Sequence, residues 1–453
     1  MINSKMIYRI IGFLLLIETA MLLCCGAVSL FYKENDLQSF LISSAITTGV
    51  GILMLAIGKG AEKSLNRRDG YVIVSTAWIA FSLFGMLPYY IGGYIPSITD
   101  AFFETMSGFS STGATIMNNI ESMPHGGIQV FAAEASGPTH DKVHPRIGVT
   151  AKWIWGIYAG MTGTLIVLLV FGGMSVFDSI CHAFTTTSTG GFSTKQASIE
   201  YYHSPYIDYV ISIFMFLSGI NFTLLLLMFN GKIKKFIHDA ELKFYFICVS
   251  FFTIFIAFWL YRTCDMGVEE AFRKSLFQVI SLQTSTGFAT ADYMLWPSIL
   301  WGCLIVVMLI GACAGSTTGG IKCIRMVILF KVAKNEFKHI LHPNAVLPVR
   351  VNKQVISPSI QSTVLAFTFL YAVIAIISIL IMLGFGVGFL ESIGTVVSSM
   401  GNMGPGLGTC GPAYSWSELP DAAKWLLSFL MLLGRLELFT VLLLFSSDFW
   451  KKN

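Results

Sequence analysis

The chain has 453 residues and is strongly apolar, with 55% hydrophobic and only 12% charged side chains and a mean hydropathy of +0.71. A soluble domain of this size does not have that composition, so the sequence predicts a protein embedded in a membrane. The net charge of +4 comes without a basic domain, which leaves nucleic-acid binding without support.

Nine apolar runs, each close to the length that crosses the hydrocarbon core, recur along the chain. The first run is longer than an ordinary signal core, lacks a convincing small-residue cleavage site and is followed by another run. We therefore interpret it as a membrane span. The sequence predicts an all-α polytopic membrane protein. The runs cover residues 7–31, 40–58, 72–94, 153–174, 206–229, 244–261, 297–330, 360–383 and 425–445.

Basic residues gather in three loops, at residues 59–68, 232–243 and 331–353. Membrane proteins tend to keep Lys and Arg in their cytoplasmic loops, so we expect these three loops to be cytoplasmic. A solvated face is enough to explain their charge, and the alternative is a docking surface for a soluble partner.

Four short glycine-centred turns lie at comparable places between the apolar runs. One such turn would mean little, but four copies predict loops that meet on one axis. There, backbone carbonyls can replace the water around a dehydrated cation. The alternative is four unrelated turns between helices. The turns are Ser111-Thr112-Gly113-Ala114-Thr115, Ser188-Thr189-Gly190-Gly191-Phe192, Ser285-Thr286-Gly287-Phe288-Ala289 and Asn402-Met403-Gly404-Pro405-Gly406.

A helical approach of about a dozen residues precedes each turn, and a helix of that length reaches only about 18 Å into a bilayer and must turn back. Its carbonyl end places partial negative charge at the turn. The central glycines are 77, 97 and 117 residues apart, so the four units are unequal parts of one chain. The last turn carries Asn402-Met403, which excludes a strict ring of hydroxyls but leaves backbone carbonyls in every turn. The approaches cover residues 100–112, 178–189, 275–286 and 392–403.

The apolar run at residues 297–330 is too long for one upright span. Its 34 residues would form a helix of about 51 Å against a hydrocarbon core of about 30 Å. It must tilt, extend outside or break. Gly311, Gly315 and Gly319 are spaced four apart, so one interpretation is a packing face between helices. The poor helix propensity of residues 316–320 favours the other interpretation, an unwound segment beside a watery cavity.

Arg435 lies in the middle of the run at residues 425–445. A cation at mid-membrane costs about 2.5–3.5 kcal/mol on insertion scales, so it should face a partner or water. Glu437 is two positions away and is a poor partner within one helix. The alternatives are an ion pair to another helix and a positive charge below the turns that obstructs cations.

The four turns, together with Gly311-Ala312-Cys313-Ala314-Gly315-Ser316-Thr317-Thr318-Gly319-Gly320, resemble the TrkH/KtrB superfamily of potassium-uptake proteins. The two spans before the first repeat, and Asn402-Met403-Gly404-Pro405-Gly406-Leu407-Gly408, favour the TrkH branch. The resemblance covers nearly the whole chain. It implies two leading helices followed by four helix–pore-helix–turn–helix pseudo-repeats around one pore.

The resemblance further implies a potassium-selective filter, with potassium as the substrate and no cofactor in this chain. It implies a homodimer in which each chain holds its own pore, a cytosolic TrkA-like nucleotide-binding regulatory subunit, symport by a Trk system and a place in the bacterial inner membrane. The implied potassium-binding residues are Ser111, Thr112, Gly113, Ser188, Thr189, Gly190, Ser285, Thr286, Gly287, Asn402, Met403 and Gly404; the implied gate consists of Gly315, Ser316, Thr317, Thr318, Gly319, Gly320 and Arg435.

One region departs from this pattern. No apolar run of spanning length lies between residues 116 and 152, where the family has the second helix of the first repeat. We expect that this chain has lost that helix between His125 and Gly127. Lys142 and Arg146 then fall on the outer side, against the positive-inside tendency. The expected division is residues 1–70 (leading helices), 71–145 (incomplete first repeat), 146–240 (second repeat), 241–350 (third repeat with the broken gate helix) and 351–453 (fourth repeat).

The sequence thus favours potassium uptake driven by the membrane potential. A less selective monovalent-cation pathway is one alternative, and a non-conducting or poorly folded membrane protein, disabled by the missing helix, is another. An enzyme is the weakest interpretation, because the chain has no H-E-x-x-H motif, paired intramembrane carboxylates or nucleophile–base set.

Overall fold

The computed structural model describes residues 2–62, 65–123 and 147–451, and these residues are mostly helical. Within them, six helices are long and apolar enough to cross a membrane, or up to eight if each of two bent pairs is one span. This confirms the predicted all-α polytopic fold. The expected helix loss between His125 and Gly127, and the placement of Lys142 and Arg146, concern residues outside the described ranges.

The α-helices are α1 (Ser4–Tyr32), α2 (Leu37–Ile57), α3 (Arg67–Gly85), α4 (Leu87–Ile91), α5 (Ile98–Phe109), α7 (Ile147–Phe171), α8 (Val176–Thr187), α9 (Pro205–Ser218), α10 (Phe222–Phe229), α11 (Ile233–Ile237), α12 (Ala240–Thr263), α13 (Val268–Gln283), α14 (Ser298–Leu309), α15 (Cys323–Leu341), α16 (Pro358–Gly384), α17 (Phe389–Gly401), α18 (Asp421–Leu436), α19 (Leu438–Leu442) and α20 (Ser447–Trp450). Single 3₁₀ turns are η1 (Ile120–Ser122), η2 (Ser198–Tyr202), η3 (Tyr293–Leu295), η4 (Gly408–Cys410) and η5 (Leu443–Phe445). One antiparallel hairpin joins β1 (Arg350–Val351) and β2 (Gln354–Val355).

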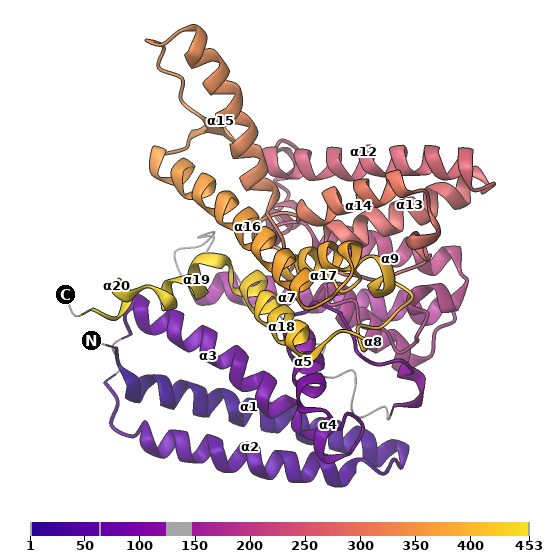
Figure 1. The fold of residues 1–453 in the computed structure, drawn as a ribbon, viewed down its shortest axis with the longest axis vertical. Coiled ribbons are helices and arrows are strands. Elements are labelled where there is room, and N and C mark those ends of the chain that lie inside the picture. Colours follow the sequence, from indigo (N-terminus) through magenta and orange to yellow (C-terminus); the bar gives the residue numbers. More distant parts are fainter. Residues whose placement is uncertain (1, 63–64, 124–146, 452–453) are drawn as a thin grey trace.

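Helices α1, α2 and α3 lie together at one edge of the molecule, drawn in indigo in Figure 1. α1 and α2 approach closely at a glycine pair, where a Cβ added to Gly12 would lie 2.8 Å from the carbonyl oxygen of Gly51. Small residues at such crossings let membrane helices pack backbone against backbone. The backbone N–H of Asn3 donates to the Asp69 carboxylate over 2.9 Å and so ties the start of α1 to the start of α3.

Four short helices end at the four glycine-centred turns, as the sequence predicts: α5, α8, α13 and α17. They are enclosed by the other helices; every residue of α5 from Ala101 to Phe109 is buried. Ser97 and Ser175 cap the first turns of α5 and α8 by accepting backbone N–H bonds from Asp100 and Asp178. One apolar core joins α13 to α7, α9, α12 and α14, and a second joins α5 and α17 to α16 and α18.

The prediction of single continuous spans at residues 206–229 and 425–445 is wrong. α9 and α10 meet at 101°, and α18 meets the helical turns after it at 115°. At the first bend Gly219 leaves no room for a side chain, since a Cβ there would lie 2.6 Å from the Tyr245 hydroxyl. Asn221 then caps α10 by accepting from the backbone N–H of Thr223 over 2.8 Å. At the second bend Glu437 adopts a left-handed φ of 60°, which ends α18.

The long run at residues 297–330 breaks, in agreement with the expectation of an unwound segment. α14 ends at Leu309, α15 begins at Cys323, and the residues between them are not helical. α15 then projects from the body of the molecule (Figure 1). Lys331 on α15 donates to the carbonyl oxygen of Arg350 in the β1–β2 hairpin over 2.7 Å. This break places irregular backbone in the centre of the molecule.

Candidate functional site

The four turns meet in a closed ring. A Cβ added to Gly113 would lie 2.6 Å from the carbonyl oxygen of Gly190, and one added to Gly404 would lie 2.8 Å from that of Thr112. A Cβ on Gly191 would overlap the carbonyl oxygen of Thr286. On Gly287, it would overlap the carbonyl oxygen of Met403. Each turn thus presents one carbonyl oxygen to the glycine of its neighbour, in cyclic order.

The turns share one backbone conformation. In each of them a non-glycine residue with a left-handed φ of 51–56° is followed two residues later by a glycine with a φ of 67–87°. The residue between them donates its backbone N–H to the carbonyl five residues earlier, over 2.8–3.0 Å. The left-handed pairs are Ser111 and Gly113, Thr189 and Gly191, Ser285 and Gly287, and Asn402 and Gly404. Glycine is required at the second position because the neighbouring carbonyl leaves no space for a Cβ.

This shared conformation corrects the alignment of the second turn. The sequence favours Ser188-Thr189-Gly190 as the counterpart of Ser111-Thr112-Gly113, whereas the backbone of the ring aligns Thr189, Gly190 and Gly191 with them. Gly190 is not among the left-handed residues, and it occupies the place that Thr112, Thr286 and Met403 fill in the other turns. Because Gly190 and Gly191 are adjacent, the sequence alone does not show which of them is the left-handed glycine of the turn.

The unwound segment between α14 and α15 lies against one side of the ring. The backbone N–H of Gly319 donates to the Ser285 hydroxyl over 2.6 Å. A Cβ on Gly319 would overlap the carbonyl oxygen of Gly401, which directly precedes the fourth turn. We call residues 310–322 the crossing loop. It includes Gly315, Ser316, Thr317, Thr318, Gly319 and Gly320, and all six line a cavity of about 1020 Å³.

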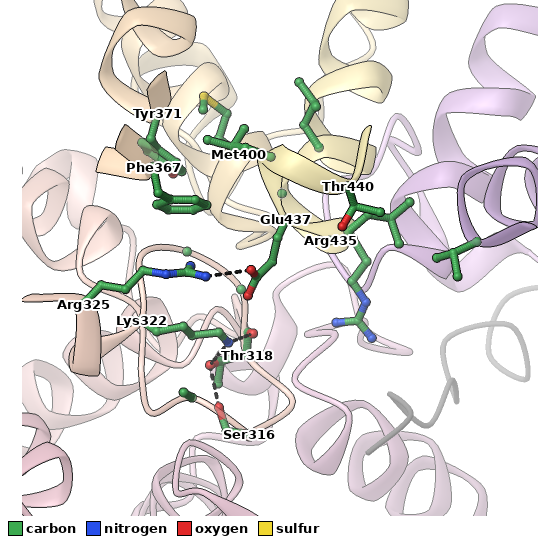
Figure 2. Close-up of a pocket in the computed structure, with 18 of the residues that line it drawn as sticks. Ser316, Thr318, Lys322, Arg325, Phe367, Tyr371, Met400, Arg435, Glu437 and Thr440 are labelled. Atoms are coloured by element: carbon green, nitrogen blue, oxygen red, sulfur yellow. Dashed lines mark hydrogen bonds and ion pairs between the residues drawn. The ribbon is translucent and has the colours of Figure 1, made fainter. Parts of the chain in front are cut away.

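Side chains hold the crossing loop at several points. The Glu241 carboxylate accepts from the backbone N–H of Ala314 in the loop over 2.7 Å and from that of Ile324 at the start of α15 over 2.9 Å. The Lys322 ammonium donates to the carbonyl and the hydroxyl of Thr318 (Figure 2). Sequence reasoning missed both residues. A carboxylate in the first turn of an apolar helix was the only available signal for Glu241.

Arg435 stands at the end of α18 and contacts the crossing loop. Its guanidinium donates to the carbonyl oxygen of Thr317 over 3.2 Å and lies 5.7 Å from the ring centre of Trp78. Glu437 instead pairs with Arg325 across the cavity over 2.6 Å, as Figure 2 shows. The bend at Glu437 makes this possible. The arginine is therefore placed beneath the turns, next to the segment expected to act with it.

The charges that line this cavity are mostly positive. Arg67, Lys322, Arg325 and Arg435 face it, together with the carboxylate of Glu437. Arg325 also lies 3.9 Å from the ring centre of Phe367. Four basic side chains and one carboxylate thus line the cavity on this side of the ring.

A smaller hollow of about 70 Å³ lies on the other side of the ring. Its lining includes the four glycines Gly113, Gly191, Gly287 and Gly404 and residues that follow them in the chain. The large cavity, in contrast, is lined by Met400 and the crossing loop, which contacts residues that precede the glycines. The ring therefore separates two hollows, and the crossing loop stands between the ring and the larger one.

The chain matches the family model described as "TrkH: Cation transport protein" over residues 125–452. It is 34% identical to the Trk system potassium uptake protein TrkH of Halomonas elongata, over 99% of this chain and 100% of that protein. It is 35% identical to the protein of the same name from Escherichia coli K12, with the same coverage. The crystal structure of the potassium transporter TrkH from Vibrio parahaemolyticus superposes with a TM-score of 0.91 at 31% identity and covers 99% of both chains.

Proposed function

The chain belongs to the TrkH family of cation transport proteins, and we propose that it takes up potassium across the inner membrane of a bacterium, driven by the membrane potential. The relatives named above are potassium uptake proteins. The observation that carries the proposal is the ring of four carbonyl oxygens, from Thr112, Gly190, Thr286 and Met403, each facing the glycine of the next turn.

In this proposal the ring is the selectivity filter. Carbonyl oxygens around an axis replace the hydration shell of a cation, and the carbonyl ends of α5, α8, α13 and α17 add partial negative charge. The buried turns exclude competing water. The proposed potassium-binding residues are Ser111, Thr112, Gly113, Ser188, Thr189, Gly190, Ser285, Thr286, Gly287, Asn402, Met403 and Gly404, and the backbone alignment adds Gly191.

The crossing loop and Arg435 form the proposed gate. The loop lies directly against the third and fourth turns, so its backbone obstructs the way from the filter to the large cavity. Arg435 adds a positive charge beside the loop carbonyl of Thr317. Opening then means moving residues 315–320 aside, which breaks their hydrogen bonds to Ser285, Lys322 and Arg435 among others.

The large cavity faces the cytoplasm in this proposal. Arg67, in the first of the three basic loops, lines it together with Arg325. The loops around residues 232–243 and 331–353 touch each other, because Asn352 donates to the Asp239 carboxylate over 2.6 Å. The positive-inside tendency then sets the orientation. A cytosolic TrkA-like regulatory subunit would meet the chain on this side, and the chain would form a homodimer in which each copy holds its own pore.

A non-conducting chain is the second candidate, and one observation favours it. The alignments with the two relatives run over 483 and 490 residues, more than the 453 of this chain, so each relative has residues without a counterpart here. A missing helix in the first repeat fits this difference. Against it, the first turn takes its full place in the ring, between the turns of Gly190 and Gly404.

Potassium uptake by a bacterial strain that lacks its own potassium transporters tests the proposal. Growth at low potassium, and competition of potassium uptake by sodium, separate a selective pathway from a less selective monovalent-cation pathway. A second version of the chain, with a membrane span inserted between His125 and Gly127, is measured beside it. Uptake by the inserted version alone would establish the non-conducting candidate for the chain as it stands, and no uptake by either would refute the transport proposal.

A further inference from the structure

One position behind each turn is equivalent in all four repeats. It lies nine residues before the left-handed glycine, on the helix that leads into the turn. Glu104, His182, Gln278 and Thr395 occupy it on α5, α8, α13 and α17. All four side chains are buried. The same buried position thus carries a different polar residue in each repeat, and each residue has its own contacts.

In the first repeat Glu104 holds the strand that leaves the turn. Its carboxylate accepts from the Thr115 hydroxyl over 3.0 Å and from the backbone N–H of Ile116 over 2.9 Å. The Thr115 hydroxyl in turn accepts from the backbone N–H of Met117 over 3.0 Å. Thr115 is two residues after Gly113, so the contact fixes the backbone just beyond the ring.

The second repeat builds the same arrangement from different residues. His182 lies 2.9 Å from the hydroxyl of Ser193, which is two residues after Gly191 and accepts from the backbone N–H of Lys195. The other ring nitrogen, Nδ1, lies 2.7 Å from the carbonyl oxygen of Asp178. A carbonyl only accepts, so Nδ1 carries the proton and Nε2 of the neutral ring accepts from Ser193. The hydroxyl is therefore oriented as Thr115 is.

The third and fourth repeats depart from this arrangement. Gln278 donates to the carbonyl oxygen of Ala291 over 3.3 Å, because residue 289 is alanine and offers no hydroxyl. Thr395 donates to Glu391 in its own helix. The segment after the fourth turn is held by a residue of the third repeat instead: the Tyr293 hydroxyl donates to the carbonyl oxygen of Gly406 over 2.6 Å.

We propose that Glu104 and His182 are positioning residues for the filter, acting through the hydroxyls of Thr115 and Ser193. The inference rests on the proposed function of the ring. A hydrogen bond to a buried charged or oriented acceptor is stronger than one to water, and it leaves the returning strand one conformation. Without this hydrogen bond the segment after the turn can shift, and the adjoining ring carbonyls of Thr112 and Gly190 can shift with it. A small shift is enough to change a potassium-sized site toward a sodium-sized one.

Glu104→Ala, Glu104→Gln, Thr115→Val and Ser193→Ala test the inference, with Thr395→Val as the matched control. Thr395 has the same place on α17 but no described contact with its turn. Potassium uptake is measured for its KM, its maximal rate and its competition by sodium, each corrected for the amount of protein in the membrane. We expect Glu104→Ala and Thr115→Val to raise the KM for potassium and to lower potassium-over-sodium selectivity by about tenfold each, the worth of one such hydrogen bond.

Three comparisons separate a positioning role from a merely structural one. Glu104→Gln keeps an acceptor and should restore most of the selectivity. The double variant Glu104→Ala/Thr115→Val should lose less than the two single losses combined, because both single variants remove the Glu104–Thr115 hydrogen bond. The bonds donated by the N–H groups of Ile116 and Met117 are lost separately and add to the effect. Thr395→Val should stay within twofold of the parent. A normal KM and selectivity in Glu104→Ala, or equal losses in Thr395→Val, would overturn the inference.

The purified protein supplies a readout that does not depend on transport. Potassium that occupies the filter should raise the melting temperature more than sodium does, because a ligand stabilises the state that binds it. Glu104→Ala and Ser193→Ala should reduce this difference, and Thr395→Val should not. If the parent takes up no potassium but shows the potassium-specific stabilisation, the proposed function fails and the positioning role is still decided by the variants. If the parent shows neither, both fail.

Discussion

The filter ring and the crossing loop are both irregular backbone in the middle of a helical membrane protein, yet side chains contribute much more to holding the loop. In the ring, backbone faces backbone: the glycine of each turn touches a carbonyl of the next, and a short buried helix stands behind each turn. The crossing loop is a single segment, and much of its support comes from side chains, with Glu241, Ser285 and Arg435 among its partners.

This difference indicates that the crossing loop can move more easily than the ring. The ring cannot lose one contact without opening at that point, because each turn is in contact with both of its neighbours. The loop contacts are separate hydrogen bonds, each worth about 0.5–1.5 kcal/mol net, so they can be exchanged one at a time. A rigid element suits selection between ions of similar size, and a loosely tethered element suits gating.

The largest effect should come from Gly191→Ala. The added methyl group would overlap the carbonyl oxygen of Thr286, which belongs to the ring itself. The left-handed φ of 67° at Gly191 alone costs a non-glycine residue about 1–2 kcal/mol, which corresponds to roughly a tenfold change. We expect potassium uptake to fall by more than that factor.

Gly190→Ala is the control for this prediction. Gly190 is not left-handed, and its counterparts Thr112, Thr286 and Met403 all carry side chains. It should therefore be tolerated better than Gly191→Ala in the same uptake assay. Equal losses in the two variants would mean that the backbone alignment of the second turn is mistaken.

Shortening the loop within residues 315–320 should come next, and with the opposite sign. The change removes a steric obstruction and leaves every residue of the four turns in place, so basal flux should rise by several-fold. Ion flux into reconstituted vesicles measures it. Unchanged flux would support the packing-face interpretation of Gly311, Gly315 and Gly319.

Glu241→Ala should loosen the loop without shortening it. Two backbone N–H groups, of Ala314 and Ile324, would lose their acceptor, at a cost of about 1–3 kcal/mol for each buried group. Hydrogen exchange at these two amides should accelerate and basal flux should rise. Glu241→Gln retains a carbonyl acceptor and should do less. Unaltered exchange at both amides would show that other contacts hold the loop.

Arg435→Ala should raise basal flux by a smaller factor, since it removes one hydrogen bond to Thr317 and one positive charge. The same vesicle assay applies. Arg435→Lys keeps the positive charge on a shorter side chain, so its basal flux should lie between those of the parent and of Arg435→Ala. If flux is the same in all three proteins, Arg435 serves the packing of α18 against Trp78 and has no part in gating.

The smallest effect should follow Lys274→Ala, on the part of α13 that is distant from both the ring and the loop. Lys274 and Glu270 form a partly exposed pair one helical turn apart, and i,i+4 pairs on helix surfaces contribute about 0.3–0.5 kcal/mol. The hydrogen bond and the charge of Lys274 lower the pKa of Glu270. The contribution is therefore present above the ordinary pKa of a glutamate and is lost as the pH falls through the lowered one. Thermal unfolding at neutral and acidic pH measures it, and uptake should not change.

The sequence predicts the ring better than it predicts the loop contacts. Ser, Thr and Gly after a helix too short to cross the membrane indicate a re-entrant turn by composition and length alone. The left-handed residue of the second turn could not be chosen, because Gly190 and Gly191 are both glycine. The bend at Glu437 was not predicted because glutamate has no local tendency to end a helix, and its partner Arg325 is 112 residues away in the chain. Glu241 is 73 residues from Ala314, a distance that no local pattern bridges.

The four quarters of the ring are encoded by four separate stretches of one chain. In a channel assembled from four identical subunits, a single codon change alters every quarter at once, and a small cost is multiplied fourfold. Here a change at Glu104 leaves His182, Gln278 and Thr395 as they were. A mutation can therefore alter one quarter of the ring while the other three quarters still bind the ion. The mixture of carboxylate, imidazole, amide and hydroxyl behind this ring is the kind of diversity that such independence permits.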